Sequence, residues 1–277
     1  MNWKNEPLSI EDCDLTNIDH VISMDETGTP TLKNIDIFTP LNKSLFTLTG
    51  LVIDKTSINS IAELVVDLKS KYWVDGDYAG KRVVFHSRDI RKKQGAFNPQ
   101  LIAYSNFLQD LDELIEELPV NICSACIDKP AHNNHYLYPD PTYQLSLGFI
   151  LERLTFRFKW LHESGVIFLE SRGHKEDAEL LAQIVDILDY GSRYVNSSDL
   201  SCIKGIYFDK KLNSSKRKSY WPLELADVIS YRIHDAVRKN DFESKKFTAI
   251  RNKLIDFPDY KGHGLKIFPK ESTFNDF

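Results

Sequence analysis

The chain has few cysteines, no long apolar run and no excess of positive charge. Its 277 residues include four scattered cysteines, too few for the disulfide framework of a small secreted protein. No apolar stretch approaches the roughly 20 residues that a membrane-spanning helix requires. The N-terminal residues also lack the basic and then apolar pattern that is typical of a secretory signal. These absences predict a soluble cytoplasmic protein with reduced thiols and no membrane partner.

The charge balance gives no overall attraction to nucleic acid, because the net charge is -5 and the isoelectric point is near 5.9. Any contact with a phosphate backbone must therefore use local basic patches. One patch combines Lys81 and Arg82 with the basic residues of 88–93, and the other joins Lys210 and Lys211 to 216–218. The second patch includes a Ser/Asn-rich stretch that is typical of a surface loop. This loop is either a solvated connector or a phosphate-binding loop.

Short apolar runs alternate along the chain with segments of helical periodicity, and this pattern predicts an α/β fold with helices covering a sheet. The expected strands are Val21–Asp25, Leu45–Ile53, Val83–His86, Val120–Ile127, Val166–Glu170 and Ile203–Phe208. The expected helices cover about 58–68 and 101–115, and others begin near Pro141, His174 and Pro222. Only a proline-containing segment without helical periodicity separates the first two strands, so we expect an antiparallel hairpin there.

We expect one domain over residues 18–240, since the length suits a single large α/β core. Residues 1–17 have the pattern of an irregular extension. Residues 241–277 have that of an amphipathic, charged appendage.

The pair Cys123 and Cys126 forms a C-x-x-C motif inside an apolar run, and His132 and His135 follow at a short distance. A zinc site would need these side chains on one side of the strand, whereas strand geometry directs the two cysteines to opposite faces. Small buried strand residues are therefore the favoured interpretation.

Asp25 is the most informative residue, because it ends the apolar strand pattern that begins at Val21. Side chains alternate along a strand, so Asp25 shares a face with Val21 and Ser23 while Glu26 points the other way. A carboxylate at the edge of a core is costly without a cation or hydrogen-bond donors, which makes Asp25 a candidate metal ligand.

Two further carboxylates, Glu170 and Asp227, also lie at the ends of expected elements. Glu170 has an alternative as a strand-end partner of Arg172. Asp227 lies on a polar helical stripe opposite an apolar one, and such a stripe by itself favours a solvated face.

Several short motifs follow one another in an order that resembles the DUF3800 family, a largely uncharacterised bacterial and phage group assigned to the ribonuclease H-like superfamily. Asp25-Glu26-Thr27-Gly28 resembles its D-E-S-G opening, although Thr27 stands where serine is usual. The family commonly has a glutamine before its Ala-Asp pair, where this chain has Glu224. The other matching segments are Phe85–Ile90 with Gly95–Phe97, Ala125–Lys129, Glu170–Gly173, Glu176–Asp177 and Leu225–Asp227.

The resemblance implies a ribonuclease H-like mixed sheet and a metal-dependent nuclease, with Mg²⁺ or Mn²⁺ held by Asp25, Glu170 and Asp227. It implies His86 as a proton-transfer group or phosphate contact. Secondary site candidates are Glu26, Asp128, Asp177 and Glu224. For Asp128, a surface ion pair with Lys129 is the favoured alternative. Asp177 has an alternative role as an acid that stabilises the start of a helix through the helix dipole. Expected nucleic-acid contacts are Arg88, Arg172, Lys216, Arg217 and Lys218.

Two other functions stay open at this point. One is a non-catalytic component that binds nucleic acid or protein, for example in a phage-defence system. The other is a different metal-dependent hydrolase or phosphoryl-transfer enzyme.

Overall fold

A seven-stranded mixed sheet forms the centre of the computed structural model, which describes residues 2–192, 194–213 and 218–274. The strand order is β1-β8-β7-β2-β3-β6-β11. The strands are β1 (Leu8–Ser9), β2 (His20–Thr27), β3 (Leu45–Asp54), β6 (Val120–Asp128), β7 (Gly165–Glu170), β8 (Ile203–Asp209) and β11 (Leu265–Phe268). Five of the expected strands are thereby confirmed to within two residues, and the α/β class is confirmed with them.

The expected antiparallel hairpin is present, since β2 pairs with β3 from His20 opposite Asp54 to Thr27 opposite Thr47. Strand β3 is antiparallel to β6 as well, and the remaining neighbours in the sheet pair in parallel. Within the described sheet, β3 is therefore the one strand that runs against the others. The parallel strands end at a common edge, and that edge carries Asp25 and Glu170.

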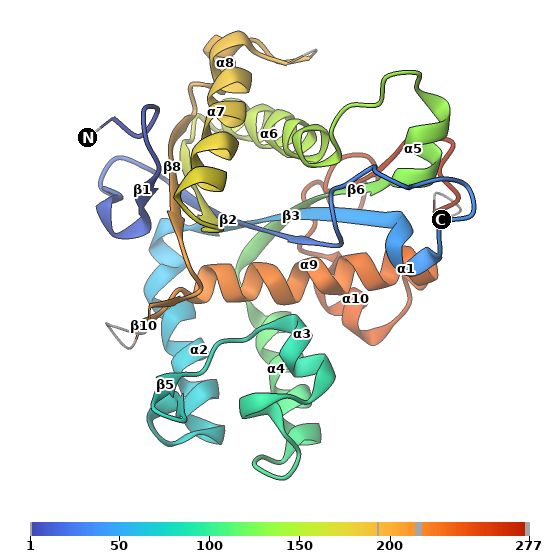
Figure 1. Ribbon diagram of the computed structural model, residues 1–277. Coiled ribbons are helices and arrows are strands. Elements are labelled where there is room, and N and C mark those ends of the chain that lie inside the picture. The colour runs from blue at the N-terminus through green and yellow to red at the C-terminus, as the bar shows by residue number, and fades with distance from the viewer. Residues whose placement is uncertain (1, 193, 214–217, 275–277) are drawn as a thin grey trace.

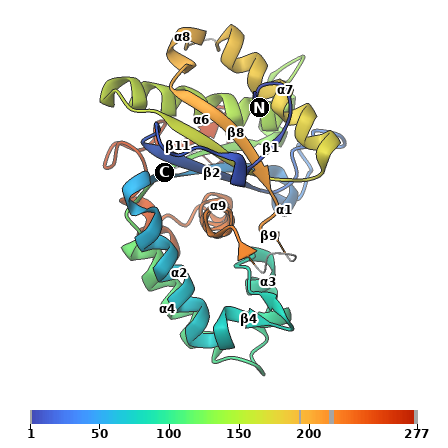
Figure 2. The same ribbon diagram turned by 90° about the vertical axis from the view of Figure 1, so that its left-hand side faces the viewer.

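Helices cover both faces of the sheet, with α6, α7 and α8 on one side and α9 on the other (Figure 1). Figure 2 shows α9 end-on beneath the sheet, and α2, α3 and α4 lie beyond it. The helices are α1 (Leu41–Ser44), α2 (Ile58–Tyr72), α3 (Ser87–Lys92), α4 (Tyr104–Glu117), α5 (Lys129–His135), α6 (Thr142–Leu161), α7 (His174–Tyr190), α8 (Ser197–Leu200), α9 (Trp221–Lys239) and α10 (Lys245–Arg251). Short 3-10 helices occupy Ile10–Asp12, Lys55–Ser57, Val74–Gly76 and Gly95–Phe97.

The two faces of the sheet contribute to separate apolar cores because strand side chains alternate. On β6, Cys123 packs in the core under α6 and α7, whereas Cys126 packs in the core that includes α9. Both cysteines are free and fully buried, and burial raises the pKa of each thiol to about 12. The expected opposite orientation of the C-x-x-C cysteines is confirmed.

The prediction of a strand at Val83–His86 is wrong. This segment is extended but lies outside any sheet; the nearby two-stranded ribbon pairs β4 (Asp77–Tyr78) with β5 (Lys81–Arg82). Its backbone N–H groups bond elsewhere: that of Val83 donates to the Gly76 carbonyl, and that of Phe85 donates to the carboxylate of Glu224. This apolar run is therefore a packed connector and not a strand. The Glu224 side chain accepts the backbone hydrogen bond that a neighbouring strand would otherwise accept.

Both terminal segments contribute strands to the central sheet. Residues of β1, from the expected N-terminal extension, pair with β8, and β11, from the expected appendage, pairs with β6. A second small ribbon pairs β9 (Leu212–Asn213) with β10 (Lys218–Ser219). No helix in the described ranges is both long enough and apolar enough to cross a membrane.

Candidate carboxylate site

Strands β2 and β7 place Asp25 and Glu170 side by side. Met24 is paired with Leu169, so each carboxylate follows one residue later on a parallel strand. Both side chains lie on the α9 face, because Val21 and Phe168 on that face alternate with Ile22 and Leu169 in the opposite core. The expected face of Asp25 is therefore confirmed, and the two carboxylates meet at the same edge of the sheet.

Helix α9 brings Asp227 to the same place. The helix lies directly under the sheet, where Ser230 is 3.1 Å from the hydroxyl of Thr27 and His234 is 3.1 Å from that of Thr47. Asp227 is 4% exposed. The expectation of a solvated polar stripe is wrong. This stripe faces the sheet, where the hydroxyl groups of Thr27 and Thr47 take the place of water as polar partners.

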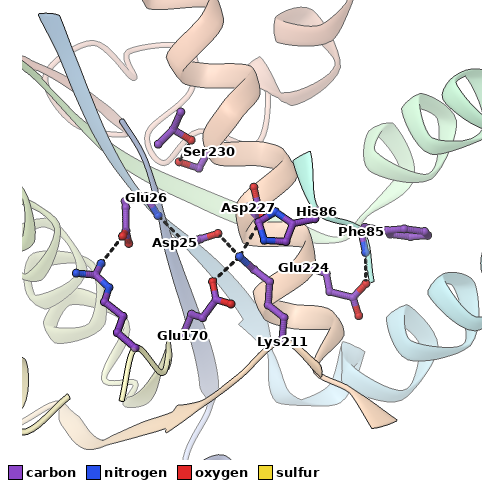
Figure 3. A network of polar contacts seen from close by, with 11 residues as sticks. Asp25, Glu26, Phe85, His86, Glu170, Lys211, Glu224, Asp227 and Ser230 are labelled. Carbon is purple, nitrogen blue, oxygen red and sulfur yellow. Dashed lines mark hydrogen bonds and ion pairs between the residues drawn. The ribbon is translucent and has the colours of Figure 1, made fainter. Parts of the chain in front are cut away.

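The three carboxylates converge on the ammonium group of Lys211, in the connection between β8 and β9 (Figure 3). Lys211 Nζ lies 2.8 Å from Asp25 Oδ2, 2.6 Å from Glu170 Oε2 and 3.1 Å from Asp227 Oδ2. Lys211 is itself 4% exposed. A single cation thus joins carboxylates from two strands and one helix.

Burial and charge act in opposite directions on these groups. Burial raises the pKa of Asp25 to about 7, although Lys211 opposes the rise. Burial would also raise the pKa of Asp227, but the hydrogen bond from His86 and the charge of Lys211 lower it to about 2. Burial alone would lower the pKa of Lys211, yet the three carboxylates raise it overall, so Lys211 carries its positive charge at neutral pH.

His86 borders the cluster and contacts Asp227 directly. Its Nδ1 lies 2.9 Å from Asp227 Oδ2, and the hydrogen bond to Asp227 raises the pKa of the imidazole. The His86 side chain is 44% exposed, so one face of the ring reaches solvent. His86 is therefore placed where it can exchange a proton between Asp227 and a bound molecule.

Glu26 and Arg172 form an ion pair beside the cluster. Figure 3 shows Glu26 turned away from Lys211, as the strand alternation predicts. The Arg172 guanidinium also lies 5.1 Å from the ring centre of Tyr143. Asp177 orients this region, since it accepts hydrogen bonds from the Ser171 hydroxyl at 2.6 Å and from the Arg172 N–H at 2.8 Å. Asp177 thus holds the turn after Glu170 and does not join the convergent carboxylates.

Glu224 and Asp128 have other partners. Both oxygens of Glu224 bind Lys69 Nζ, at 2.7 and 2.8 Å, and one also accepts the N–H of Phe85 at 2.7 Å. This carboxylate is fully buried and turned away from Lys211 (Figure 3), so its expected role as an additional oxygen ligand is not supported.

The expected surface ion pair of Asp128 with Lys129 is wrong. Asp128 is buried, caps α5 through the N–H of Ala131 and accepts the Ser272 hydroxyl at 2.9 Å. Lys129 is buried separately and donates to the carbonyl of Thr29. The C-terminal segment thereby covers the end of β6, which no periodicity in the sequence indicates.

The expected nucleic-acid contacts are only partly placed. Arg88 lies exposed on α3, and Lys218 is exposed on β10, where it is 3.6 Å from Glu11. Lys216 and Arg217 lie outside the described residues.

The histidines of the alternative zinc site have partners of another kind. His132 is buried with Nε2 2.9 Å from the Asp140 carbonyl oxygen, and the ring of His135 packs against Tyr136. With Cys123 and Cys126 on opposite faces of β6, these side chains do not assemble around one point.

The donor set of Asp25, Glu170 and Asp227 suits Mg²⁺ or Mn²⁺ in chemistry, since oxygen ligands predominate for such ions. In the described part of the chain, however, no group of three or more His, Cys, Asp or Glu side chains is arranged to hold a metal ion. The carboxylate oxygens are arranged around the ammonium of Lys211, at 2.6 to 3.1 Å from its nitrogen. Oxygen ligands of Mg²⁺ lie closer to the ion, at about 2.1 Å, so this arrangement is too wide for the metal. A metal ion at this point requires Lys211 Nζ to leave.

Lys211 is the site residue that sequence reasoning missed, since it counted only as part of a surface basic patch. The position of Lys211 just after a strand was nevertheless a signal that it could lie near Glu170. Lys211 follows the strand next to Glu170, and the carboxyl ends of adjacent parallel strands meet at one edge.

No protein-family model matches the chain, and no curated protein matches it.

Proposed function

We propose that this protein is a metal-dependent nuclease, in which Asp25, Glu170 and Asp227 hold Mg²⁺ or Mn²⁺ after Lys211 moves away. The observation that carries the proposal is the convergence of these three carboxylates on one cation. Splayed carboxylates would have favoured a non-catalytic binding component. The resemblance to DUF3800 proteins, and through it to the ribonuclease H-like superfamily, supports the same chemistry, as does the mixed sheet with its N-terminal hairpin.

Asp25, Glu170 and Asp227 would hold the divalent cations, and such cations would supply activation of water and stabilisation of the leaving oxygen of a phosphodiester. The protein's own residues contribute the rest. His86 exchanges a proton at its solvent-facing edge while Asp227 fixes the ring through Nδ1. Lys211 has a four-carbon stem with several rotatable bonds, so its ammonium could move off the three carboxylates and contact a substrate phosphate.

Nucleic acid is the proposed substrate, and the cytoplasm is the proposed location. Because the chain is acidic overall, approach to a phosphate backbone depends on exposed cations such as Arg88 and Lys218. Arg172 contributes less to this approach, since Glu26 already neutralises it.

Cleavage assays on single carboxylate variants test the proposal. Wild type and the variants Asp25→Asn, Glu170→Gln and Asp227→Asn are incubated with single- and double-stranded DNA and RNA in Mg²⁺, Mn²⁺ or Ca²⁺. Each variant should lose cleavage by at least about 100-fold, because the metal-binding carboxylates act as one unit. Nucleic-acid binding should survive, and Ca²⁺ should support binding with little cleavage.

The matched control is Asp177→Asn, which changes a nearby buried carboxylate outside the convergent set. If wild type cuts no substrate with any metal while the variants bind nucleic acid normally, the nuclease proposal fails.

A non-catalytic binding component is the second candidate, and one observation favours it. Lys211 already neutralises part of the carboxylate charge, so the site is stable without a metal ion. In that case the cluster is a structural ion network that fixes α9 to the sheet. The same cleavage assay separates the two functions.

A further inference from the structure

A hollow of about 570 Å³ lies between the end of α5, helix α6 and strand β11. Three aromatic rings form part of its wall, with Phe268 in contact with the other two. Tyr136 stacks on Phe268 with ring centres 5.9 Å apart and an interplanar angle of 12°, and Phe149 lies 5.2 Å from Phe268. Because these rings are partly exposed, an apolar and flat surface faces the hollow.

This hollow is separate from the carboxylate cluster. Helix α6 covers one face of the sheet, whereas the cluster lies against α9 on the other (Figures 1 and 2). Strands β2, β3 and β6 also stand between β7, which carries Glu170, and β11.

Two cations lie over the same ring in this hollow. The Arg153 guanidinium is 5.6 Å from the ring centre of Phe149, and Lys266 Nζ is 5.7 Å from it. Arg153 donates to the backbone carbonyls of Gly262 and Phe149. Among the described residues, no carboxylate forms an ion pair with Arg153 or Lys266. Two positive charges are thus held close together on an aromatic wall without a direct ion pair to a described carboxylate.

The electrostatic cost of this arrangement is visible at Lys266. Burial lowers the pKa of its ammonium, and the charges of Arg153 and Lys270 lower it further. Two carboxylates, Glu152 and Glu271, line the hollow as well. Glu152 accepts a hydrogen bond from the Ser192 hydroxyl, and its charge opposes part of the fall in the Lys266 pKa. An anion bound near Arg153 and Lys266 would relieve the repulsion.

We propose that this hollow binds a nucleotide unit, with its base against the aromatic wall and its phosphate near Arg153 and Lys266. A flat ring joined to an anion matches both features, since bases stack on aromatic side chains and phosphates bind arginine and lysine. The volume is within the usual range for small-molecule sites, about 300–1,000 Å³. The proposal goes beyond nuclease activity, because it requires neither a metal ion nor the carboxylate cluster.

Calorimetry in EDTA tests this site with the full chain. The probes are AMP, adenosine, inorganic phosphate and a single-stranded adenylate hexamer. AMP should bind at least about tenfold more tightly than adenosine or phosphate, because each of those keeps only half of the contacts. A hexamer that binds more tightly than AMP identifies a strand as the source of the nucleotide, and equal or weaker binding identifies a free nucleotide.

Two variants locate the binding. Lys266→Met should weaken AMP or hexamer binding about tenfold, and Phe149→Leu should do so by a similar factor through lost stacking. The matched control is Lys204→Met, which removes an exposed lysine on β8. Circular dichroism confirms that each variant folds.

The proposal is overturned if neither AMP nor the hexamer binds, or if both bind Lys266→Met and Phe149→Leu as tightly as wild type. Asp25→Asn should bind AMP like wild type in EDTA. AMP binding in EDTA is therefore expected even if the protein cuts no nucleic acid. Equally, a lack of AMP binding would not contradict the nuclease proposal.

Discussion

At the scale of single residues, Lys211 decides what the carboxylate cluster can do. Its ammonium occupies the point toward which Asp25, Glu170 and Asp227 all turn. Since two cations cannot share that point, a divalent metal ion bound there would compete with Lys211. Lys211 therefore offsets part of the carboxylate charge, and the proposed metal binding would require the displacement of a buried ion-pair network.

Replacing Lys211 by methionine should strengthen metal binding and weaken the metal-free fold. Without the ammonium, three buried carboxylates repel one another, so unfolding free energy in EDTA should fall by about 3–5 kcal/mol. Mn²⁺ affinity, measured by calorimetry, should rise at least about tenfold because no internal cation competes. Mn²⁺ should also restore the melting temperature of the variant.

Lys210→Met is the matched control, since the neighbouring lysine is exposed. Unchanged or weaker Mn²⁺ binding by the Lys211 variant would show that the carboxylates do not form a metal site.

His234 should make stability depend on pH, because burial lowers the pKa of its imidazole to about 4. Its Nδ1 lies 3.1 Å from the Thr47 hydroxyl. The charged side chains that act on it are Arg238, Asp235, Arg91 and Lys129.

The unfolded chain takes up the proton near pH 6.5 and the folded protein only near pH 4, so the stability from the neutral ring is complete above pH 6.5. It is lost as pH falls toward 4, by about 3 kcal/mol in total. Urea unfolding of wild type and His234→Gln between pH 7 and 4 measures this contribution as a difference. Parallel pH profiles for the two proteins would contradict it.

At the scale of elements, the pair of Lys69 and Glu224 joins α2 to α9 and holds the connector that carries His86. Lys69 is 2% exposed and Glu224 is fully buried, and Glu224 also accepts the N–H of Phe85. The residue after Phe85 is His86, which contacts Asp227. A buried ion pair in one core thus fixes the backbone that presents a residue to the carboxylate site.

Breaking this pair on one side should cost more than removing both charges. Lys69→Met leaves a buried carboxylate without its cation, so urea unfolding should show a loss of about 3–5 kcal/mol. The double variant Lys69→Met/Glu224→Gln should recover part of that loss, because its amide oxygen still accepts from Phe85 and no charge stays buried. Equal stability of the single and double variants would show that the unpaired Glu224 carboxylate carries no penalty for its buried charge.

At the scale of the whole molecule, long-range pairing extends the sheet at both edges. The short strands β1 and β11 come from segments whose sequences show no strand pattern, and they pair with β8 and β6. Leu265 and Ile267 of β11 are buried in the core that contains α9. Parallel partners far away in the chain stabilise these strands, and local propensity plays little part.

Local periodicity in the sequence was sufficient to predict the five main strands, the five long helices, the β2–β3 hairpin and the face on which Asp25 lies. Each depends on alternation or helical spacing between near neighbours, which the chain carries in any context. The same reasoning wrongly predicted a strand at Val83–His86. A side chain of the distant helix α9 accepts the backbone hydrogen bond of this connector, and local periodicity does not indicate that contact.

Only tertiary packing decided the rest of the site. Lys211 reaches Asp227, Glu170 and Asp25 across 16, 41 and 186 positions of sequence, so no local pattern indicates that they meet. The polar stripe of α9 has the spacing of a solvated face, and it is buried because the sheet surface above it carries hydroxyl and carboxylate groups. Periodicity determines which residues share a face, whereas the partner opposite that face determines whether a charge meets water, a lysine or a metal ion.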